Sequence, residues 1–234
     1  ACVFMTMFGL VGIEFFGAQY LQLVLGMDPL TAGLWTLPSS LGFIAGSFIV
    51  PLVARRLGTL RVMVGGLVLS ALGFVLLGFV GTTGLAMLVL GSVVFSVGLS
   101  PVVALTTNLV VSSAPPERAG SASSLSETSS ELGGALGIAV LGTIAAAVYR
   151  ASMINAIPGG APQPVGDAAR GTMGGAMAMA EQLPGPVGAT LLEAARTAYV
   201  QGMQVSTSIS AAIMLGTAAL AIILLRAHAA KPGK

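Results

Sequence analysis

Six long runs of apolar residues dominate the sequence, and each is long enough to cross a lipid bilayer as a helix. The hydrocarbon core of a bilayer is about 30 Å thick, and a helix needs about 20 predominantly apolar residues to cross it. The runs cover residues 1–25, 33–53, 62–80, 84–111, 123–149 and 205–225. Strands of a transmembrane β-barrel would be about half as long and would alternate between apolar and polar residues. The runs therefore predict an all-α, polytopic membrane protein with six transmembrane helices.

Charged residues are too few to cover a water-exposed surface of this size. They make up 8% of the 234 residues, whereas hydrophobic residues make up 55%. An average soluble domain carries about 25% charged residues. Much of the surface must therefore face lipid, and the 32 glycines are typical of membrane helices that pack through small residues. The ten Lys and Arg residues lie in short clusters between the runs, so they do not indicate nucleic-acid binding.

The basic residues between the runs predict how the chain lies in the membrane. Cytoplasmic loops of membrane proteins carry an excess of Lys and Arg. With six spans, three groups of basic residues fall on one side: Arg55, Arg56 and Arg61, then Arg118, then Arg226, Lys231 and Lys234. We therefore expect a multi-pass protein of the cell (inner or plasma) membrane, with both ends of this chain in the cytoplasm.

A long polar interval before the last run sets the domain organisation. Five spans are predicted within residues 1–149, an extracellular loop at 150–203, the last span at 204–226 and a cytoplasmic tail at 227–234. Within the loop, residues 157–164 are rich in proline and glycine, which predicts irregular chain. Two short helices are predicted at 167–183 and 187–199, on either side of a Pro-Gly-Pro turn. We expect them to form a helical hairpin on the outer membrane surface.

Three carboxylates lie within the predicted spans, where an ionised group is costly and usually has a function. Glu14 lies near the middle of the first run. Glu127 and Glu131 lie four residues apart, and so on one helix face, at the cytoplasmic end of the fifth run. We predict that these acids exchange protons or attract a cationic substrate. The alternatives are a protonated Glu14 hydrogen-bonded to a neighbouring helix, and solvated carboxylates at 127 and 131.

Glycines and prolines inside the runs mark predicted packing and bending positions. Glycines allow a neighbouring helix to approach closely, and proline bends a helix because it removes a backbone hydrogen bond. The positions are Gly133, Gly134 and Gly137 in the fifth run, Gly98 and Pro101 in the fourth, and Pro38 in the second. Bends around a central cavity suit a transporter whose two ends open in turn, but a static bundle tolerates them as well.

No cluster of catalytic or metal-binding residues is visible in the sequence. Cys2 is the single cysteine, which excludes an internal disulfide framework and a cysteine metal cage. The one histidine, His228, lies in the predicted tail. An enzyme would need clustered His, Asp or Cys side chains at one depth in the membrane. We therefore predict no enzyme activity, no cofactor and no bound metal.

Three segments resemble one family of transporters. Residues 19–26 (QYLQLVLG), with 29–34 (PLTAGL) and Pro38, are similar to the opening of the C-terminal half in the 14-helix drug:proton antiporters of the major facilitator superfamily. A segment with Arg55, Arg56, Gly58 and Arg61 (RRLGTLR) resembles the basic cytoplasmic loop of that superfamily. The most specific match covers 116–142, around Glu127 and Glu131, and is similar to the quaternary-ammonium and methyl-viologen efflux branch.

The resemblance covers essentially the whole chain and implies a six-helix C-terminal half of a major facilitator fold with an extracellular helical hairpin. It implies multidrug efflux by proton antiport, in which lipophilic cationic drugs or dyes leave the cell in exchange for protons. Acidic residues of the fifth-span motif would take part in proton coupling or cation recognition. The other partners would be the lipid bilayer and a missing N-terminal half, with no nucleic acid and a monomeric full-length protein.

The first residue already lies inside an apolar run and is not methionine. We therefore expect a fragment that does not transport alone. Two other functions stay open: a major facilitator transporter of another small solute, and a non-transporting membrane assembly protein. An anionic solute would favour an Arg or Lys within the spans, which this sequence lacks, and a purely structural protein would not need Glu14.

Overall fold

The computed structural model describes residues 2–113, 115–154, 156 and 163–229. In this part of the chain, six helices are long and apolar enough to cross a membrane, and the elements are all helical. The predicted all-α, polytopic fold is confirmed. Most of the predicted irregular segment, at 157–162, and the end of the predicted tail, at 230–234, lie outside the described residues.

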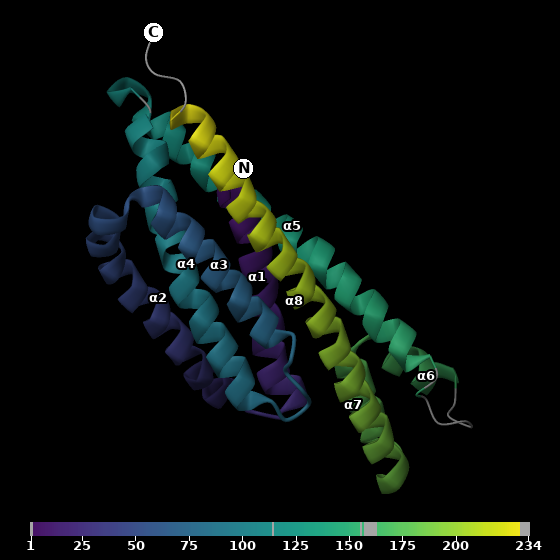
Figure 1. Cartoon of the computed structure of the whole chain (residues 1–234). Coiled ribbons are helices and arrows are strands. Elements are labelled where there is room, and N and C mark those ends of the chain that lie inside the picture. Colours follow the sequence, from purple (N-terminus) through teal and green to yellow (C-terminus); the bar gives the residue numbers. More distant parts are fainter. Residues whose placement is uncertain (1, 114, 155, 157–162, 230–234) are drawn as a thin grey trace.

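Eight α-helices form the described structure (Figure 1). They are α1 (Cys2–Gln19), α2 (Pro29–Leu57), α3 (Thr59–Leu77), α4 (Leu85–Ser113), α5 (Ala119–Met153), α6 (Gln163–Gly171), α7 (Met173–Ala180) and α8 (Gly185–Ala229). A π-helical turn (Tyr20–Val24) continues α1, and a 3-10 turn (Pro116–Arg118) precedes α5. The beginning of α1 and the end of α8 lie at one end of the bundle, here called the terminal end, and α6 and α7 lie at the opposite hairpin end (Figure 1).

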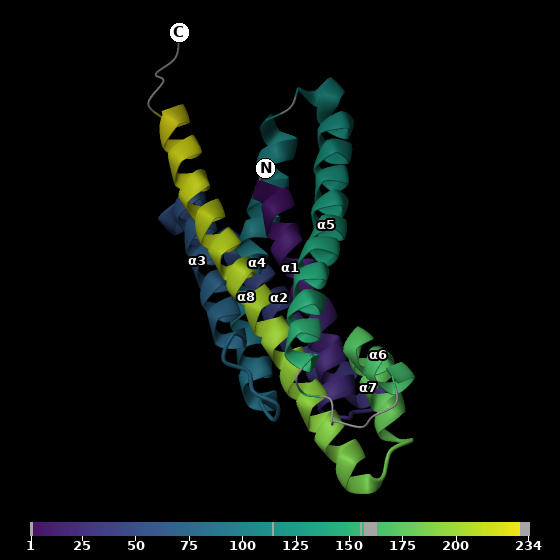
Figure 2. The same cartoon turned by 90° about the vertical axis from the view of Figure 1, so that its right-hand side faces the viewer.

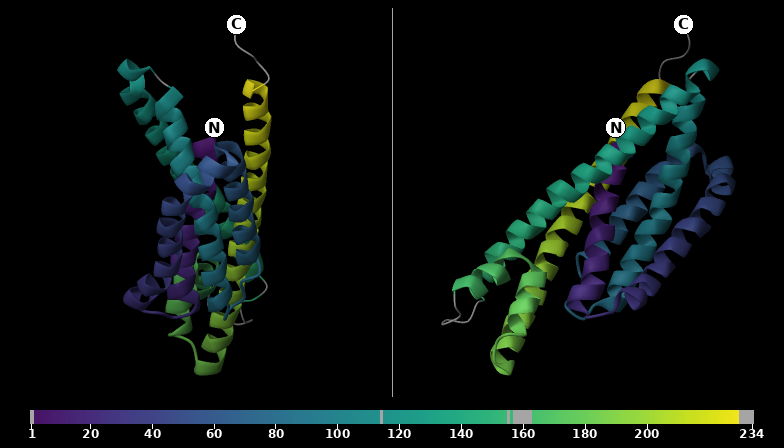
Figure 3. Two further views of the ribbon diagram at one scale, coloured as in Figure 1. Left: turned by 60° about the vertical axis from the view of Figure 1, so that its left-hand side comes forward. Right: turned by 180° about the vertical axis from the view of Figure 1, so that it is seen from behind.

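The helices pack as two groups that α8 joins. α4 packs against α2 and α3, whereas α1 packs against α5 and α8, and α8 also packs against α3. The main core includes the rings of Phe74 and Phe95, whose centroids lie 4.7 Å apart. At the terminal end, the beginning of α5 and the end of α8 diverge (Figures 2 and 3).

Two close contacts hold α3 against α4. A Cβ added at Gly98 would lie 2.5 Å from the backbone nitrogen of Ser70, and one added at Gly66 would lie 2.5 Å from the carbonyl oxygen of Gly98. Both positions must therefore lack a side chain for the two backbones to touch. The α4 helix continues through Pro101, and α2 continues through Pro38, so neither proline ends its helix.

Polar contacts fix the connections at the hairpin end. The Tyr20 hydroxyl donates to the Gly81 carbonyl (2.6 Å) and accepts the N–H of Gly84 (2.9 Å), which ties the α3–α4 connection to the end of α1. The Asp28 carboxylate caps α2 by accepting the backbone N–H groups of Leu30 and Thr31. Hydrogen bonds from the Thr31 side chain and backbone, and from the Leu30 backbone, hold the pKa of Asp28 below its usual value.

The hairpin differs from the prediction at two boundaries. The helix expected at 167–183 is divided into α6 and α7, because Thr172 is extended (φ −153°, ψ 157°) and its hydroxyl caps α7 by accepting the N–H of Gly175. The expected helix at 187–199 and the last span form one continuous helix, α8. No proline interrupts this stretch, and Gly202 serves packing, since a Cβ there would lie 2.8 Å from the Ala145 carbonyl oxygen.

The length of α8 explains how the hairpin is held. Its 45 residues span about 67 Å, roughly twice the hydrocarbon thickness of a bilayer. The helix is therefore too long to lie entirely within the hydrocarbon core along the membrane normal, and α7 packs against it. A small separate core of buried residues, including Tyr149, Met173 and Leu191, joins α6 and α7 of the hairpin to α5 and α8.

Candidate functional site

Glu14 lines a pocket of about 300 Å³ between α1, α2 and α4, here called the Glu14 pocket. Among the described residues that line this pocket, Glu14 is the only charged one. The lining residues are Glu14, Gly17, Ala18 and Leu21 from the first span, Trp35, Thr36, Ser39 and Ser40 from α2, and Leu88, Val89, Ser92, Phe95 and Ser96 from α4. Ion pairs in the described structure are confined to the hairpin and the adjoining part of α8, and none involves Glu14.

The chemistry of the Glu14 pocket suits a hydrophobic cation. A carboxylate attracts positive charge, and the face of an indole ring such as Trp35 stabilises a cation within about 6 Å. The hydroxyls on α2 already donate to backbone carbonyls: Thr36 to Gly33, and Ser39 and Ser40 to Thr36. Each of these hydroxyls has its one proton engaged and can offer a ligand only acceptor lone pairs, which favours a positively charged ligand.

Glu127 lines a second, smaller pocket between α1, α4 and α5, here called the Glu127 pocket. Its volume is about 100 Å³. The lining residues are Val3, Thr6 and Met7 from α1, Val102, Val103, Thr106 and Thr107 from α4, and Ser126, Glu127 and Ser130 from α5. Since α1 begins at the terminal end, the contribution of Val3 places this pocket toward that end of the bundle.

The three predicted acids are not gathered at one point. Met7 lines the Glu127 pocket, and Glu14 lies seven residues further along α1, which is about 10 Å of helix. All three side chains are exposed, and Glu131 lines neither the Glu14 pocket nor the Glu127 pocket. The structure therefore assigns Glu14 and Glu127 to separate pockets that share α1 and α4 as walls.

The predicted packing glycines of α5 lie directly against α1. A Cβ at Gly133 would lie 2.5 Å from the Phe4 carbonyl oxygen, and a Cβ at Gly137 would overlap the Phe8 carbonyl oxygen. Gly134 is buried as well. This contact brings the α5 backbone close to α1 and so fixes the wall from which Glu127 extends.

The predicted basic loop joins α2 to α3. Arg55 and Arg56 lie in the last turn of α2, and Arg61 lies in the first turn of α3. All three side chains are exposed. Gly58 connects the helices with φ +87°, a conformation that residues with a Cβ rarely adopt. This connection lies at the terminal end (Figure 1).

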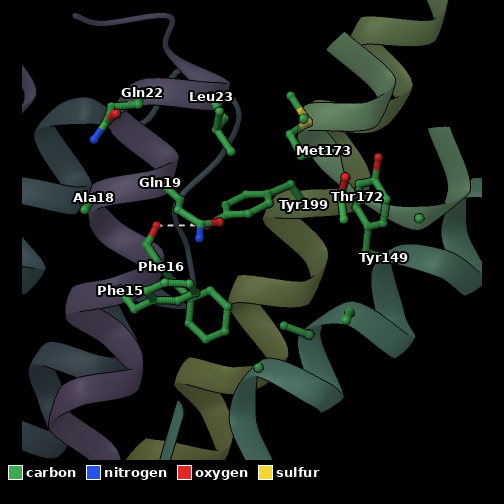
Figure 4. A pocket seen from close by; sticks show the side chains of 15 residues that line it. Phe15, Phe16, Ala18, Gln19, Gln22, Leu23, Tyr149, Thr172, Met173 and Tyr199 are labelled. Atoms are coloured by element: carbon green, nitrogen blue, oxygen red, sulfur yellow. Dashed lines mark hydrogen bonds between the residues drawn. The ribbon is translucent and has the colours of Figure 1, made fainter. Parts of the chain in front are cut away.

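A cavity of about 560 Å³, larger than the Glu14 pocket and the Glu127 pocket, was not predicted from the sequence. It lies beneath the hairpin, between α1, α5, α7 and α8 (Figure 4). Phe15, Phe16, Tyr149, Tyr199 and Met173 provide most of its aromatic and sulfur-bearing surface, and Gln19 and Gln22 add two amides. The Tyr199 hydroxyl donates to the Phe16 carbonyl (3.0 Å). Its lining comes from four separate segments, and the two glutamines within an apolar run are the sequence signal that could have indicated it.

These features define an α-helical, multi-pass membrane protein with solute-sized pockets between its helices. The family model described as Major Facilitator Superfamily matches residues 1–162. The chain belongs to this superfamily, which is a family of transporters, and the resemblance found in the sequence is confirmed.

Curated relatives extend the match to nearly the whole chain. The multidrug efflux pump LfrA of Mycolicibacterium smegmatis is 38% identical over 95% of this chain and 44% of its own length. The tetracenomycin C resistance and export protein of Streptomyces glaucescens is 31% identical over 94% of this chain and 42% of its own length. The methyl viologen resistance protein SmvA of Salmonella typhimurium is 32% identical over 90% of this chain and 42% of its own length. The chain thus spans less than half the length of these relatives.

Proposed function

We propose that this chain is the C-terminal half of a multidrug:proton antiporter of the cell membrane, and that its Glu14 pocket binds hydrophobic or cationic compounds. The observation that carries the proposal is the position of Glu14, the one charged residue lining a pocket that also holds Trp35. The names of the relatives, which describe drug efflux, export and resistance, support it.

The pocket has an open side that suits a second half. Trp35 is 41% exposed, and the neighbouring α2 residues Leu34 and Leu37 are more than half and about half exposed, respectively. Substrate sites of such transporters lie between two structural repeats near the middle of the membrane. We propose that an N-terminal half covers this side, and that the resulting protein acts as a monomer with both ends of this chain in the cytoplasm.

Exchange of a cationic drug for a proton follows if both cations bind to the same carboxylate. When Glu14 holds a proton, its attraction for a cationic drug is lost, and a bound cation disfavours protonation, so the two ligands have a negative coupling free energy. Protons that enter from outside then displace the drug. We propose that Glu127 and Glu131, which are carried on α5, take part in the proton transfer that accompanies the movement of the two halves.

The test measures uptake of ethidium by energised inverted membrane vesicles that contain the complete transporter with this chain as its C-terminal half. Uptake is expected and should collapse when the proton gradient is dissipated. Glu14→Gln should reduce it strongly. The control is Glu117→Gln, which removes an exposed carboxylate from the 3-10 turn before α5.

A binding measurement separates recognition from transport. Trp35→Ala should weaken binding of tetraphenylphosphonium to the purified protein by about tenfold, because a desolvated cation–π contact contributes roughly 1–2 kcal/mol. Trp35→Phe should weaken it less. If Glu14→Gln, Trp35→Ala and the parent protein show equal uptake and equal binding, the Glu14 pocket is not the substrate site.

A further inference from the structure

The cavity of about 560 Å³ beneath the hairpin, here called the hairpin cavity, has no part in the function proposed above. Its volume lies within the range of pockets that bind drug-sized compounds, roughly 300–1,000 Å³. Phe15, Phe16 and Gln19 of α1 line this cavity, whereas Glu14 lines the Glu14 pocket, and Ala18 lines both. The first span therefore contributes a wall to each of two separate spaces.

Two tyrosines place aromatic rings at fixed positions in the hairpin cavity. The Tyr149 hydroxyl donates to the Ala169 carbonyl of α6 (2.9 Å). The Tyr199 hydroxyl donates to the Phe16 carbonyl of α1 (3.0 Å), and Figure 4 shows the Tyr199 ring extending from α8 toward α1. Because neighbouring elements already hold both rings, little conformational entropy is lost when a ligand packs against them.

Glycines leave flat walls between these rings. Gly142 of α5, Gly171 at the end of α6 and Gly174 of α7 all line the cavity. A Cβ added at any of the three would meet no heavy atom within 4 Å apart from the adjoining chain. A ligand can therefore approach the backbone closely there. Aromatic rings prefer offset-stacked or edge-to-face contacts with other rings, so the combination favours a planar aromatic ligand.

The polar groups of the cavity favour a ligand without charge. The described lining residues include no acidic or basic side chain. An ion would find no counter-charge there, and contact with aromatic faces offsets only part of the cost of its dehydration. The side-chain amides of Gln19 and Gln22 make no hydrogen bond within the described chain. An amide both donates and accepts hydrogen bonds, which matches uncharged carbonyl and hydroxyl groups.

We propose that the hairpin cavity is a binding site for uncharged, planar aromatic compounds. The rings of Phe16, Tyr149 and Tyr199 contact the aromatic system, the Met173 thioether adds a polarisable contact, and the Gln19 amide bonds a carbonyl or hydroxyl group of the ligand. The site goes beyond the proposed function and does not depend on it. No carboxylate of the described chain lines it, so a compound bound there does not compete with a proton for an acid.

Photolabelling with benzophenone tests the site. Benzophenone is an uncharged diaryl ketone that, once excited by light, bonds covalently to nearby C–H groups and reacts readily at methionine. The complete transporter, with this chain as its C-terminal half, is irradiated in lipid nanodiscs, and peptide mass spectrometry locates the adducts. We expect a saturable adduct at Met173, which lines the cavity. Excess anthraquinone, which is uncharged and planar, should displace it.

Filling the cavity should prevent labelling. Gly142→Phe adds a ring where the structure has open space, and should abolish the Met173 adduct. The matched control is Gly216→Phe, because Gly216 is an exposed residue of α8 that also has open space beside it but does not line the cavity. Thermal midpoints identify a variant that fails to fold. Gly174→Phe fills the cavity from α7 and provides an independent second variant.

Removal of one amide tests the polar contact. Gln19→Leu keeps the approximate size of the side chain, and should raise the benzophenone concentration for half-maximal labelling roughly fivefold, the equivalent of one hydrogen bond. Gln201→Leu removes an exposed amide of α8 that does not line the cavity, and should leave this concentration unchanged.

The absence of a saturable Met173 adduct in the parent protein would overturn the site, as would equal labelling of the parent, Gly142→Phe and Gly174→Phe. A phospholipid that native mass spectrometry detects on the parent but not on Gly142→Phe would identify a lipid as the occupant instead. Displacement of the label by tetraphenylphosphonium would refute the preference for uncharged compounds. Labelling needs no proton gradient, so the result is independent of whether the transporter takes up ethidium.

Discussion

The contact between α5 and α1 predicts a large difference between two glycines of the same helix. A Cβ at Gly137 would overlap the Phe8 carbonyl oxygen and would lie 2.9 Å from the carbonyl carbon and the Cα of Phe8. These are backbone atoms, so they cannot rotate away as a side chain would. At Gly142, little more than one turn further, no heavy atom apart from the adjoining backbone of α5 lies within 4 Å of the added Cβ.

Gly137→Ala therefore requires α1 to move by roughly 1 Å before ordinary van der Waals contact is restored. Overpacking of this kind costs about 1–3 kcal/mol. Gly142→Ala meets no such contact, and its free energy of unfolding should rise by up to about 1 kcal/mol because alanine has the higher helix propensity. The same propensity gain applies to Gly137→Ala, so the difference between the two variants isolates the cost of the contact.

The assay is thermal unfolding of the purified chain in detergent, followed by the change in intrinsic fluorescence. For a protein of this size, 1 kcal/mol shifts the unfolding midpoint by about 2–4 °C. We expect the midpoint of Gly137→Ala to lie about 5 °C below that of Gly142→Ala. If Gly137→Ala unfolds at the same temperature as Gly142→Ala or higher, the α1 and α5 backbones are not in contact here.

Two further predictions concern the connections at the hairpin end. Tyr20→Phe removes the hydroxyl that pairs with both Gly81 and Gly84. It should lower the free energy of unfolding by about 1–3 kcal/mol, because two backbone groups lose their partner. An unchanged unfolding midpoint would show that this hydroxyl does not hold the α3–α4 connection. The pKa of Asp28 is lowered in the folded protein. The ionised carboxylate that caps α2 therefore stabilises the fold at pH values above the usual carboxyl pKa of about 3.9. This stabilisation is lost as the pH falls through the lowered pKa. Asp28→Asn retains an uncharged cap and should therefore show a smaller loss of thermal midpoint between about pH 7 and pH 3; parallel pH profiles for the two proteins would refute this account.

The fold was predictable because the bilayer imposes a strong rule on the sequence. Backbone polar groups cannot be left unpaired in hydrocarbon, so each apolar run of sufficient length must form a helix. The hairpin lay outside this rule. There, local geometry decided the outcome: the extended backbone of Thr172 divides α6 from α7, while α8 continues from the hairpin into the last span.

The candidate site was predictable in part. Glu14 and Glu127 were identified because an acid in an apolar run is conspicuous, and Gly133 and Gly137 because glycines within a predicted span allow a neighbouring helix to approach closely. Thr6 and Thr106 were not identified. In the sequence they resemble the many other hydroxyls of the predicted spans, and only the packing of three helices places them in the pocket that Glu127 lines.

By itself, the sequence determined that this chain lies in a membrane, which of its segments are long and apolar enough to cross it and which acids those segments carry, because these properties depend on the transfer of local segments from water to lipid. The tertiary structure alone decided which residues share a pocket. Glu14 joins Trp35, and Glu127 joins Thr6 and Thr106, because helix packing brings together residues that are far apart in the chain and leaves spaces where bulky and small side chains do not match.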